Sequence, residues 1–378
     1  ADARRSAERE AREAERAAAR ESELAAHYRE TEHDGDTFVM RPGRVELVTE
    51  DKHGEAVVRT LGYFSAPLVE VLSDVASPDA EPARTVVLSL RGDRETAPRR
   101  VELSAEAFGA MLWPAAYGAT VGTGPGVREL LRCALERLSE PARLTRYGFT
   151  GWTLDGGAWR YLSAGEVLGA EGPVAGVAVR ASELAAGYTL PRPAEGDELA
   201  QGLATLAGVL ALAPGNVLVP LFGATFRAAL GPSRCALHLV GAPTVGKTFA
   251  ALWFARLFGP RVEALDWTTS TAVGLKRSLA AVGEALVVLD DLRVLGTRAD
   301  EDTARKVDEV FRALFNRTGA AKGQRTGGVR AEVRGRCLVV STGETLPSGH
   351  SLRSRVAMLD MGARAEGLPA EDLSGVMA

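Results

Sequence analysis

The C-terminal half of the sequence predicts an α/β domain built around a parallel β-sheet. Apolar runs of strand length recur there, separated by stretches of helical character, at residues 235–240, 261–265, 285–289 and 337–341. Strands that are apolar throughout are buried on both faces, and their alternation with helices is typical of a parallel sheet. The preceding sequence has shorter β-like runs, which predict a smaller α+β domain.

This smaller domain and its flanking segments divide the chain into three predicted parts. Strands are expected at residues 37–40, 44–48, 84–90 and 99–103, with helices near 104–116 and 126–138. Pro191, Pro193, Gly196 and Asp197 indicate a linker after them. We therefore expect a charged helical connecting segment over 1–35, an α+β domain over 36–195 and the parallel-sheet domain over 196–378.

The N-terminal segment alternates Arg and Glu on an Ala-rich background. Pairs such as Glu8 and Arg12 have the i,i+4 spacing that supports a helix. Because the acids match the bases, a solvated connecting helix is favoured over a DNA-binding arm. The same density of charge argues against a secretory signal, which needs an apolar centre.

Composition restricts the classes of protein that the chain can belong to. Its 378 residues, 46% hydrophobic and 25% charged, are sufficient for two buried cores. The formal net charge of -4 means that any contact with nucleic acid must come from a local basic patch. Cys133, Cys235 and Cys337 are too far apart for a metal-binding pair, and their odd number favours a reducing cytoplasm.

One long apolar stretch, residues 203–230, has almost no charge. Pro214, Gly215, Asn216 and Pro220 interrupt it, and these residues would leave backbone groups unsatisfied in lipid. We expect two short buried helices around a turn, and no association with a membrane.

The residues after the apolar run at 235–240 match the phosphate-binding pattern G-x-x-x-x-G-K-[ST]. They are Gly241, Ala242, Pro243, Thr244, Val245, Gly246, Lys247 and Thr248, and Phe249 follows in the first turn of a predicted helix. The glycines allow backbone N–H groups and the helix N-terminus to face phosphate oxygens. Lys247 would supply positive charge to the β and γ phosphates, and Thr248 a hydroxyl for Mg²⁺. Since the strand and the helix lie where the pattern needs them, we expect these nine residues to bind ATP with Mg²⁺.

Two carboxylates, Asp290 and Asp291, end the apolar run at 285–289. An acid at such a strand end holds Mg²⁺ through water in enzymes with this loop, and Asp290 is the candidate. Asp291 would orient or deprotonate the attacking water. The alternative is a strand end capped by solvated acids.

Hydroxyl and guanidinium groups follow the last apolar run. Thr342 or Ser341 could sense the γ-phosphate, although a turn closed by hydroxyl-to-backbone hydrogen bonds is an alternative. Arg355, with Arg353 in reserve, could reach a neighbouring subunit and offset charge at its γ-phosphate. A surface ion pair is the competing interpretation of these arginines.

A Gly-rich basic segment, residues 317–336, contains six bases and one acid. Lys322, Arg325 and Arg330 are its candidate DNA contacts, because such charges suit phosphate backbones. The alternatives are a mobile solvated loop or one that binds nucleotide across a subunit interface. His238 is interpreted as a packing residue, and the Trp267-Thr268-Thr269 step either approaches the nucleotide or caps a helix.

Together these residues resemble the helicases of plasmids, phages and integrative elements grouped as domain-of-unknown-function family 927. The P-loop module of that family is similar to superfamily 3 and AAA+ motors. The resemblance rests on the phosphate-binding loop, Trp267-Thr268, Asp290-Asp291, residues 319–325, residues 341–344 and Arg355. More loosely, it includes residues 108–113, 150–152, 155–156 and 161–162.

The resemblance implies a homohexameric ring with ATP between neighbours and the basic segment in a central DNA channel. Single-stranded or forked DNA would be the partner, with a primase domain or protein as a further one. A replicative helicase motor is therefore our leading hypothesis. The alternatives are a nucleotide-gated initiator or defence scaffold that does not unwind DNA, and an ATP-dependent remodeller of proteins.

Overall fold

The computed structural model describes residues 29–33, 36–211, 215–293, 298–316, 334–345 and 354–362. They form two compact units. The first extends to Asp74 and continues over Pro82–Thr145, and the second contains Val75–Glu81 and the chain from Arg146 onward. The main division therefore falls at residue 145, about fifty residues before the predicted linker, because residues 146–190 pack with the parallel sheet.

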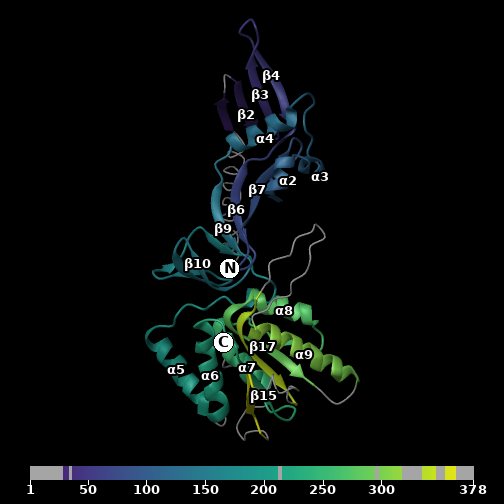
Figure 1. Ribbon diagram of the computed structural model, residues 1–378. Coiled ribbons are helices and arrows are strands. Elements are labelled where there is room, and N and C mark those ends of the chain that lie inside the picture. The colour runs from purple at the N-terminus through teal and green to yellow at the C-terminus, as the bar shows by residue number, and fades with distance from the viewer. Residues whose placement is uncertain are drawn as a thin grey trace, which may run out of the picture. The chain divides into compact units, whose positions relative to one another are not determined.

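The first unit is built from antiparallel strands with helices packed on them (Figure 1). One sheet has the order β1-β2-β3-β4, with β1 Arg29–His33, β2 Asp36–Arg41, β3 Arg44–Glu50 and β4 Ala56–Gly62. A further set of strands contains β5 Phe64–Ser65, β6 Leu68–Val75, β7 Ala83–Gly92, β8 Arg99–Ser104 and β9 Ala142–Tyr147. This unit therefore has an α+β architecture.

Three described helices complete the first unit: α2 Ala105–Ala110, α3 Trp113–Ala116 and α4 Val127–Arg137. The sequence predicts one helix over 104–116, but Met111 has a left-handed backbone (φ 49°) that ends α2. Pro114 then lies in the first turn of α3, where its missing N–H costs no hydrogen bond. Leu131 and Leu135 place one face of α4 in the core.

The second unit contains a five-stranded parallel sheet in the order β16-β17-β18-β15-β19. Its strands are β15 Ala236–Val240, β16 Leu265–Asp266, β17 Gly283–Leu292, β18 Arg336–Gly343 and β19 Val356–Asp360. Its helices are α5 Gly196–Ala211, α6 Gly215–Ala229, α7 Lys247–Ala255, η2 Arg256–Phe258, α8 Ala272–Ala281 and α9 Arg298–Asn316. Figure 1 shows α6 and α7 on one side of this sheet and α8 and α9 on the other. The predicted α/β architecture with a parallel sheet is confirmed.

The strand predicted at 261–265 is much shorter in the structure, where β16 contains only Leu265 and Asp266. Its first residues form a turn instead, closed by a hydrogen bond from Val262 N to Gly259 O of 3.1 Å. By contrast, β17 extends beyond the predicted run and includes Asp290 and Asp291. Both acids are therefore part of β17 itself, near its carboxyl end, and β17 is paired on both sides.

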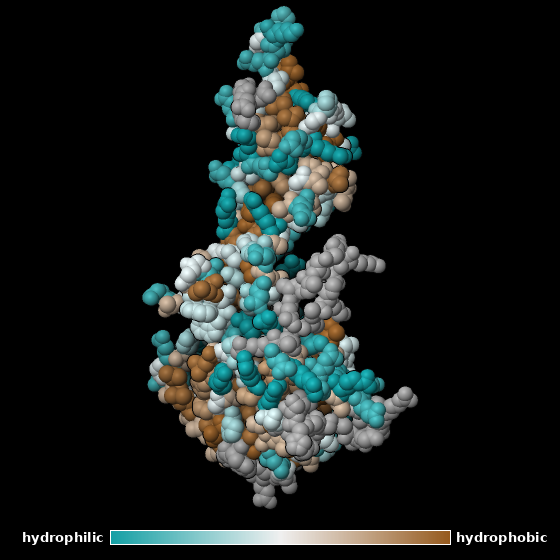
Figure 2. Space-filling model, in the orientation of Figure 1, coloured by the Kyte–Doolittle hydropathy of each residue, from teal (hydrophilic) through white to brown (hydrophobic). Residues whose placement is uncertain are grey.

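Helices α5 and α6 confirm the prediction of two helices in this stretch, but only α6 is buried, and the turn expected between them lies outside the described residues. Val217, Leu221 and Ala228 of α6 lie in the core, whereas α5 has no buried residue. The prediction that both helices are buried was wrong, because apolar composition alone does not say whether a helix finds a partner. Figure 2 shows apolar side chains over α5 and α6, where Leu203 and Phe226 are 56% and 57% exposed.

No helix among the described residues combines the length and the apolar character needed to cross a membrane.

A small antiparallel sheet, β10 Gly151–Asp155, β11 Ala158–Leu162, β12 Val167–Gly169 and β13 Gly172–Pro173, also belongs to the second unit. It is followed by β14 Val177–Val179 and η1 Ala185–Gly187. Hydroxyl groups of Tyr161 and Tyr188 donate hydrogen bonds to the carbonyls of Glu284 and Leu286 in β17, at 2.9 and 3.1 Å. Buried hydroxyls need such partners, so these bonds attach residues 146–190 to the parallel sheet.

Candidate nucleotide-binding site

The phosphate-binding loop connects β15 to α7. All neighbouring strand pairs of the sheet are parallel, so the strands end at one edge, and the loop begins where β15 ends. Thr244 and Gly246 have left-handed backbones, with φ of 66° and 88°. Since α7 begins directly at Lys247, the N–H groups of its first turn lack helical acceptors, which favours an anion there.

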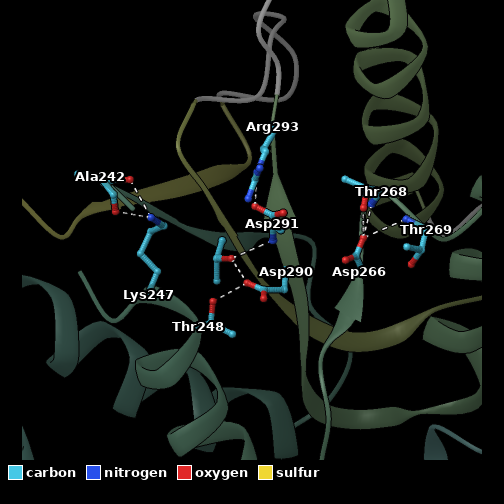
Figure 3. Close-up of polar contacts among 11 residues, drawn as sticks. Ala242, Lys247, Thr248, Asp266, Thr268, Thr269, Asp290, Asp291 and Arg293 are labelled. Atoms are coloured by element: carbon cyan, nitrogen blue, oxygen red, sulfur yellow. Dashed lines mark hydrogen bonds and ion pairs between the residues drawn. The ribbon is translucent and has the colours of Figure 1, made fainter. Parts of the chain in front are cut away.

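The side chain of Lys247 folds back over this loop. Its Nζ donates hydrogen bonds to the carbonyl oxygens of Gly241 and Ala242, at 2.8 and 2.7 Å (Figure 3). Burial lowers the pKa of Lys247, although the carboxylates of Glu344, Asp290 and Asp291 act in the opposite direction. Among the described residues, the hydrogen-bond partners of the ammonium group are these two carbonyls, which a phosphate oxygen could replace.

Asp290 is the point at which three elements of the sheet edge meet. Thr248 Oγ1, from α7, donates a hydrogen bond of 2.7 Å to Asp290 Oδ1. Thr342 Oγ1, from the end of β18, donates to the same carboxylate oxygen. A hydroxyl and a carboxylate are oxygen ligands of the kind that Mg²⁺ prefers, so Thr248 and Asp290 fit this metal.

Asp291 has an uncommon backbone and a cationic partner. Its φ is 61°, and its N–H donates to Thr342 Oγ1 at 3.2 Å. Its Oδ1 accepts a hydrogen bond of 2.8 Å from Nε of Arg293, the residue that follows β17. No sequence pattern singles out Arg293, and its place two residues after Asp291 is the available signal.

Trp267, which directly follows β16, supports the end of β17 that carries Asp290 and Asp291. It is fully buried, its indole Nε1 donates to Ser341 Oγ at 3.0 Å, and its backbone N–H donates to Asp290 O at 3.0 Å. Of the two hydroxyls considered as sensors, Ser341 is therefore bonded to Trp267, whereas Thr342 contacts Asp290. The hydroxyl and N–H of Thr268 and the N–H of Thr269 donate to Asp266, closing a turn at the end of β16.

His238 and Lys306 pack against or support the elements that form the site. His238 is completely buried within β15, and its Nε2 is 2.9 Å from Thr345 O. Burial lowers the pKa of its imidazole, which disfavours a charged role. Lys306 of α9 donates to the carbonyl oxygens of Trp267 and Ser270, the latter at 3.0 Å, and so links α9 to the end of β16.

Arg355 lies at the opposite edge of the sheet from Lys247. Its carbonyl accepts from the N–H of Ala236, which begins β15, while its Nη1 donates to Asn316 Oδ1 at 3.0 Å. Its guanidinium also lies 5.9 Å from the ring centre of Phe315. The structure thus does not bring Arg355 to the phosphate-binding loop of its own chain. Arg353, Lys322, Arg325 and Arg330, like residues 1–28, lie outside the described residues.

Comparison with known proteins gives little information about this chain. No family model matches the sequence, and no curated protein matches it. A solved structure of the active helicase Cch of SCCmec type IV is similar at a TM-score of 0.47 and 13% identity, covering 86% of this chain. This chain spans 58% of the length of that one. NtrX from Brucella abortus is similar at a TM-score of 0.24 and 13% identity, with 45% of this chain and 44% of that one covered.

Similarity of this degree identifies neither a family nor a function. The site geometry, and the sequence motifs that produce it, are what bear on function.

Proposed function

We propose that the second unit hydrolyses ATP with Mg²⁺ and that the chain is a replicative, ring-forming DNA helicase motor. The observation that supports the ATPase most strongly is the meeting of Thr248, Asp290 and Thr342 on one carboxylate oxygen. The ammonium group of Lys247 lies at the same edge of the sheet. The bonds of Thr248 and Thr342 to Asp290 join residues that are far apart in sequence. A strand end that is merely capped by solvated acids would not bring these two hydroxyls to one carboxylate oxygen.

In the proposed reaction, Lys247 and the loop N–H groups bind the phosphates, and Thr248 and Asp290 hold Mg²⁺. The bound metal would offset negative charge on the phosphates. Asp291 accepts a proton from water, whose oxygen forms a bond to the γ-phosphorus. The bond from this phosphorus to the bridging oxygen breaks, and its electron pair remains on ADP. Thr342 orients both acids through its hydroxyl.

Assembly into a ring is proposed from the position of Arg355. This guanidinium is at the strand-start edge, so in a single chain it cannot stabilise charge at its own nucleotide. A neighbouring subunit would bring it to the γ-phosphate, with Arg353 in reserve. The homohexamer and the ATP site between neighbours are proposed from the family resemblance.

Contact with DNA is proposed from the basic segment at 317–336. Its last residues lie beside the helix that precedes it, because a Cβ added at Gly335 would come 2.9 Å from Leu314 Cδ1. Asn316, the residue before the segment, is the hydrogen-bond partner of Arg355. If Arg355 moved toward a neighbour's nucleotide, its bond to Asn316 would therefore also move the residue from which the basic segment continues. Lys322, Arg325 and Arg330 would contact the phosphates of single-stranded or forked DNA.

This proposal is tested by the steady-state rate of ATP hydrolysis with and without single-stranded and forked DNA. We expect DNA to increase the rate severalfold, and the double change Arg325→Ala and Arg330→Ala to remove only this increase. A rate that is indifferent to DNA but increases with unfolded polypeptide would favour a protein remodeller. Very slow turnover with DNA binding but without strand separation would favour the initiator or defence scaffold.

Thr342 and Ser341 provide a matched comparison within one strand. We expect Thr342→Ala to lower kcat for ATP by about ten- to a hundredfold, since it removes a hydroxyl bonded to an ionised carboxylate. Thr342→Ser should restore most of the activity because it returns the hydroxyl. Ser341→Ala removes the partner of Trp267 and should lower thermal stability more than kcat. Equal effects of Thr342→Ala and Ser341→Ala on kcat would contradict the sensor role of Thr342.

A further inference from the structure

Arg293 is a second cationic side chain at the edge of the sheet that carries Lys247. It immediately follows β17, and Figure 3 shows its side chain directed toward Asp291. The pKa of Arg293 is raised chiefly by its hydrogen bond to Asp291, with smaller contributions from the carboxylates of Glu344 and Asp266. Arg293 therefore lies among the acids that surround the phosphate-binding loop.

The ion pair of Arg293 with Asp291 contributes little to folding. The side chains of the two residues are 56% and 37% exposed, and pairs this accessible to water stabilise a protein only weakly. The pair nevertheless occupies the carboxylate that the proposed reaction needs. Arg293 Nε occupies Oδ1, which is one of the two carboxylate oxygens that could accept a proton from water.

Arg293 also supplies what Arg355 cannot supply within one chain. Arg355 is fixed at the strand-start edge through Asn316 and Ala236. Arg293 is at the strand-end edge, beside the acid that would face the attacking water. A guanidinium binds phosphate oxygens as readily as carboxylates, often through two hydrogen bonds. The γ-phosphate of a bound nucleotide would compete with Asp291 for it.

Building on the proposed ATP hydrolysis, we propose that Arg293 binds the γ-phosphate of ATP in its own chain and leaves Asp291 when it does so. A nucleoside triphosphate thereby frees Oδ1 of the carboxylate that accepts the proton of water, whereas a diphosphate leaves the Arg293–Asp291 pair intact. The contact selects ATP over ADP and couples the release of Asp291 Oδ1 to the presence of the bond to be broken.

The test measures the dissociation constants of ATPγS and ADP, each with Mg²⁺, by competition with a fluorescent nucleotide. Arg293→Ala should increase the dissociation constant of ATPγS by about tenfold, which is the scale of one charge-assisted hydrogen bond. It should increase the dissociation constant of ADP by less than about twofold. Arg293→Lys should retain part of the preference for ATPγS. Asp291→Asn should have the opposite effect and strengthen the binding of ATPγS relative to ADP, because the neutral amide oxygen competes for Arg293 less strongly than the carboxylate does.

Arg312→Ala is the matched control. Arg312 pairs with Asp308 on α9 at 2.7 Å, and the two side chains are 57% and 36% exposed, as in the Arg293 pair. It lies away from the phosphate-binding loop and should leave both dissociation constants unchanged. The double change Arg293→Ala and Asp291→Asn should lose the gain seen with Asp291→Asn alone.

The outcomes separate this inference from the proposed function. Suppose that the wild type binds and hydrolyses ATP, but Arg293→Ala weakens the binding of ATPγS and ADP equally or changes neither. The γ-phosphate contact is then overturned and the proposed ATPase stands. If the wild type binds neither nucleotide, both proposals are overturned. A selective loss of ATPγS with unchanged ADP supports the contact, since general disruption of the site would weaken both.

Discussion

Replacing Lys247 with Ala is expected to lower the rate of ATP hydrolysis by about a thousandfold or more. The ammonium group would contact the β and γ phosphates in both the bound and the reacting states, and no neighbouring side chain of the loop carries a positive charge. Its present partners are the carbonyls of Gly241 and Ala242. Loss of these bonds on a partly exposed loop should change stability little, so the folded fraction at 25 °C should stay that of the wild type.

Lys276→Ala is the control for loss of a lysine from the same unit. Its Nζ pairs with Glu309 at 2.5 Å, and its side chain is only 15% exposed, but it lies on α8 away from the loop. It should retain nearly the full rate. Steady-state phosphate release and thermal unfolding of both variants provide the comparison. If Lys247→Ala hydrolysed ATP like Lys276→Ala, the loop would not be the nucleotide site.

The local part of the site could be predicted from sequence because it is contiguous. A strand, a Gly-rich turn, Lys247 and a helix follow one another over residues 236–255, an order that one motif fixes. Asp290 was predictable because it ends an apolar strand, and parallel strands end at the same edge of a sheet. The structure places Thr248, Asp290 and Thr342 together, while their catalytic roles stay proposals.

Partners fixed by tertiary contact were not predictable. The bond between Trp267 and Ser341 joins residues 74 positions apart, and either residue alone has a common role as a cap or a turn. Arg293 is one of many arginines in an Arg-rich chain. Its residue type therefore does not predict a place in the site unless the position of Asp291 is known. Arg355 illustrates the reverse case: its spacing suggests a catalytic site, whereas its contacts are Asn316 and Phe315.

The compact units divide at a different place from the predicted linker for a related reason. Pro191, Pro193 and Gly196 have the composition of a linker, and composition locates flexible backbone rather than the limits of a core. What decides the boundary is the hydrogen bonds of Tyr161 and Tyr188 to β17, across 123 and 98 residues of sequence. Gly151 contributes too: a Cβ there would lie 2.2 Å from Glu284 Oε2, so only glycine allows β10 to approach β17 this closely.

The same junction gives the largest expected effect on stability, through Glu284→Ala. Glu284 is 2% exposed, and its Oε2 accepts hydrogen bonds from Trp152 N at 2.8 Å and lies 3.1 Å from Arg336 Nη1. Burial lowers the pKa of Arg336, and the Glu284 carboxylate opposes this shift. Removing the carboxylate leaves the guanidinium of Arg336, which is only 16% exposed, without its counter-charge. We expect this to reduce the free energy of unfolding by about 3 kcal/mol.

Urea unfolding followed by tryptophan emission is the appropriate measurement, because Trp152, Trp159, Trp253 and Trp267 all belong to the second unit. Glu309 is 51% exposed and pairs with Lys276. Glu309→Ala should reduce the free energy of unfolding by less than about 1 kcal/mol. Alanine keeps the left-handed backbone of Glu284 (φ 41°) as strained as glutamate does, so the comparison reports the side chain.

The double change Glu284→Ala and Arg336→Ala separates two reasons for a loss of stability. If the uncompensated charge is the cause, removing Arg336 as well should recover part of the loss, despite its further hydrogen bonds to the carbonyls of Trp152 and Thr150. If the losses simply add, Glu284 acts mainly as the acceptor for the N–H of Trp152. In that case the junction depends on backbone hydrogen bonding, and the ion pair is incidental to holding β10 against β17.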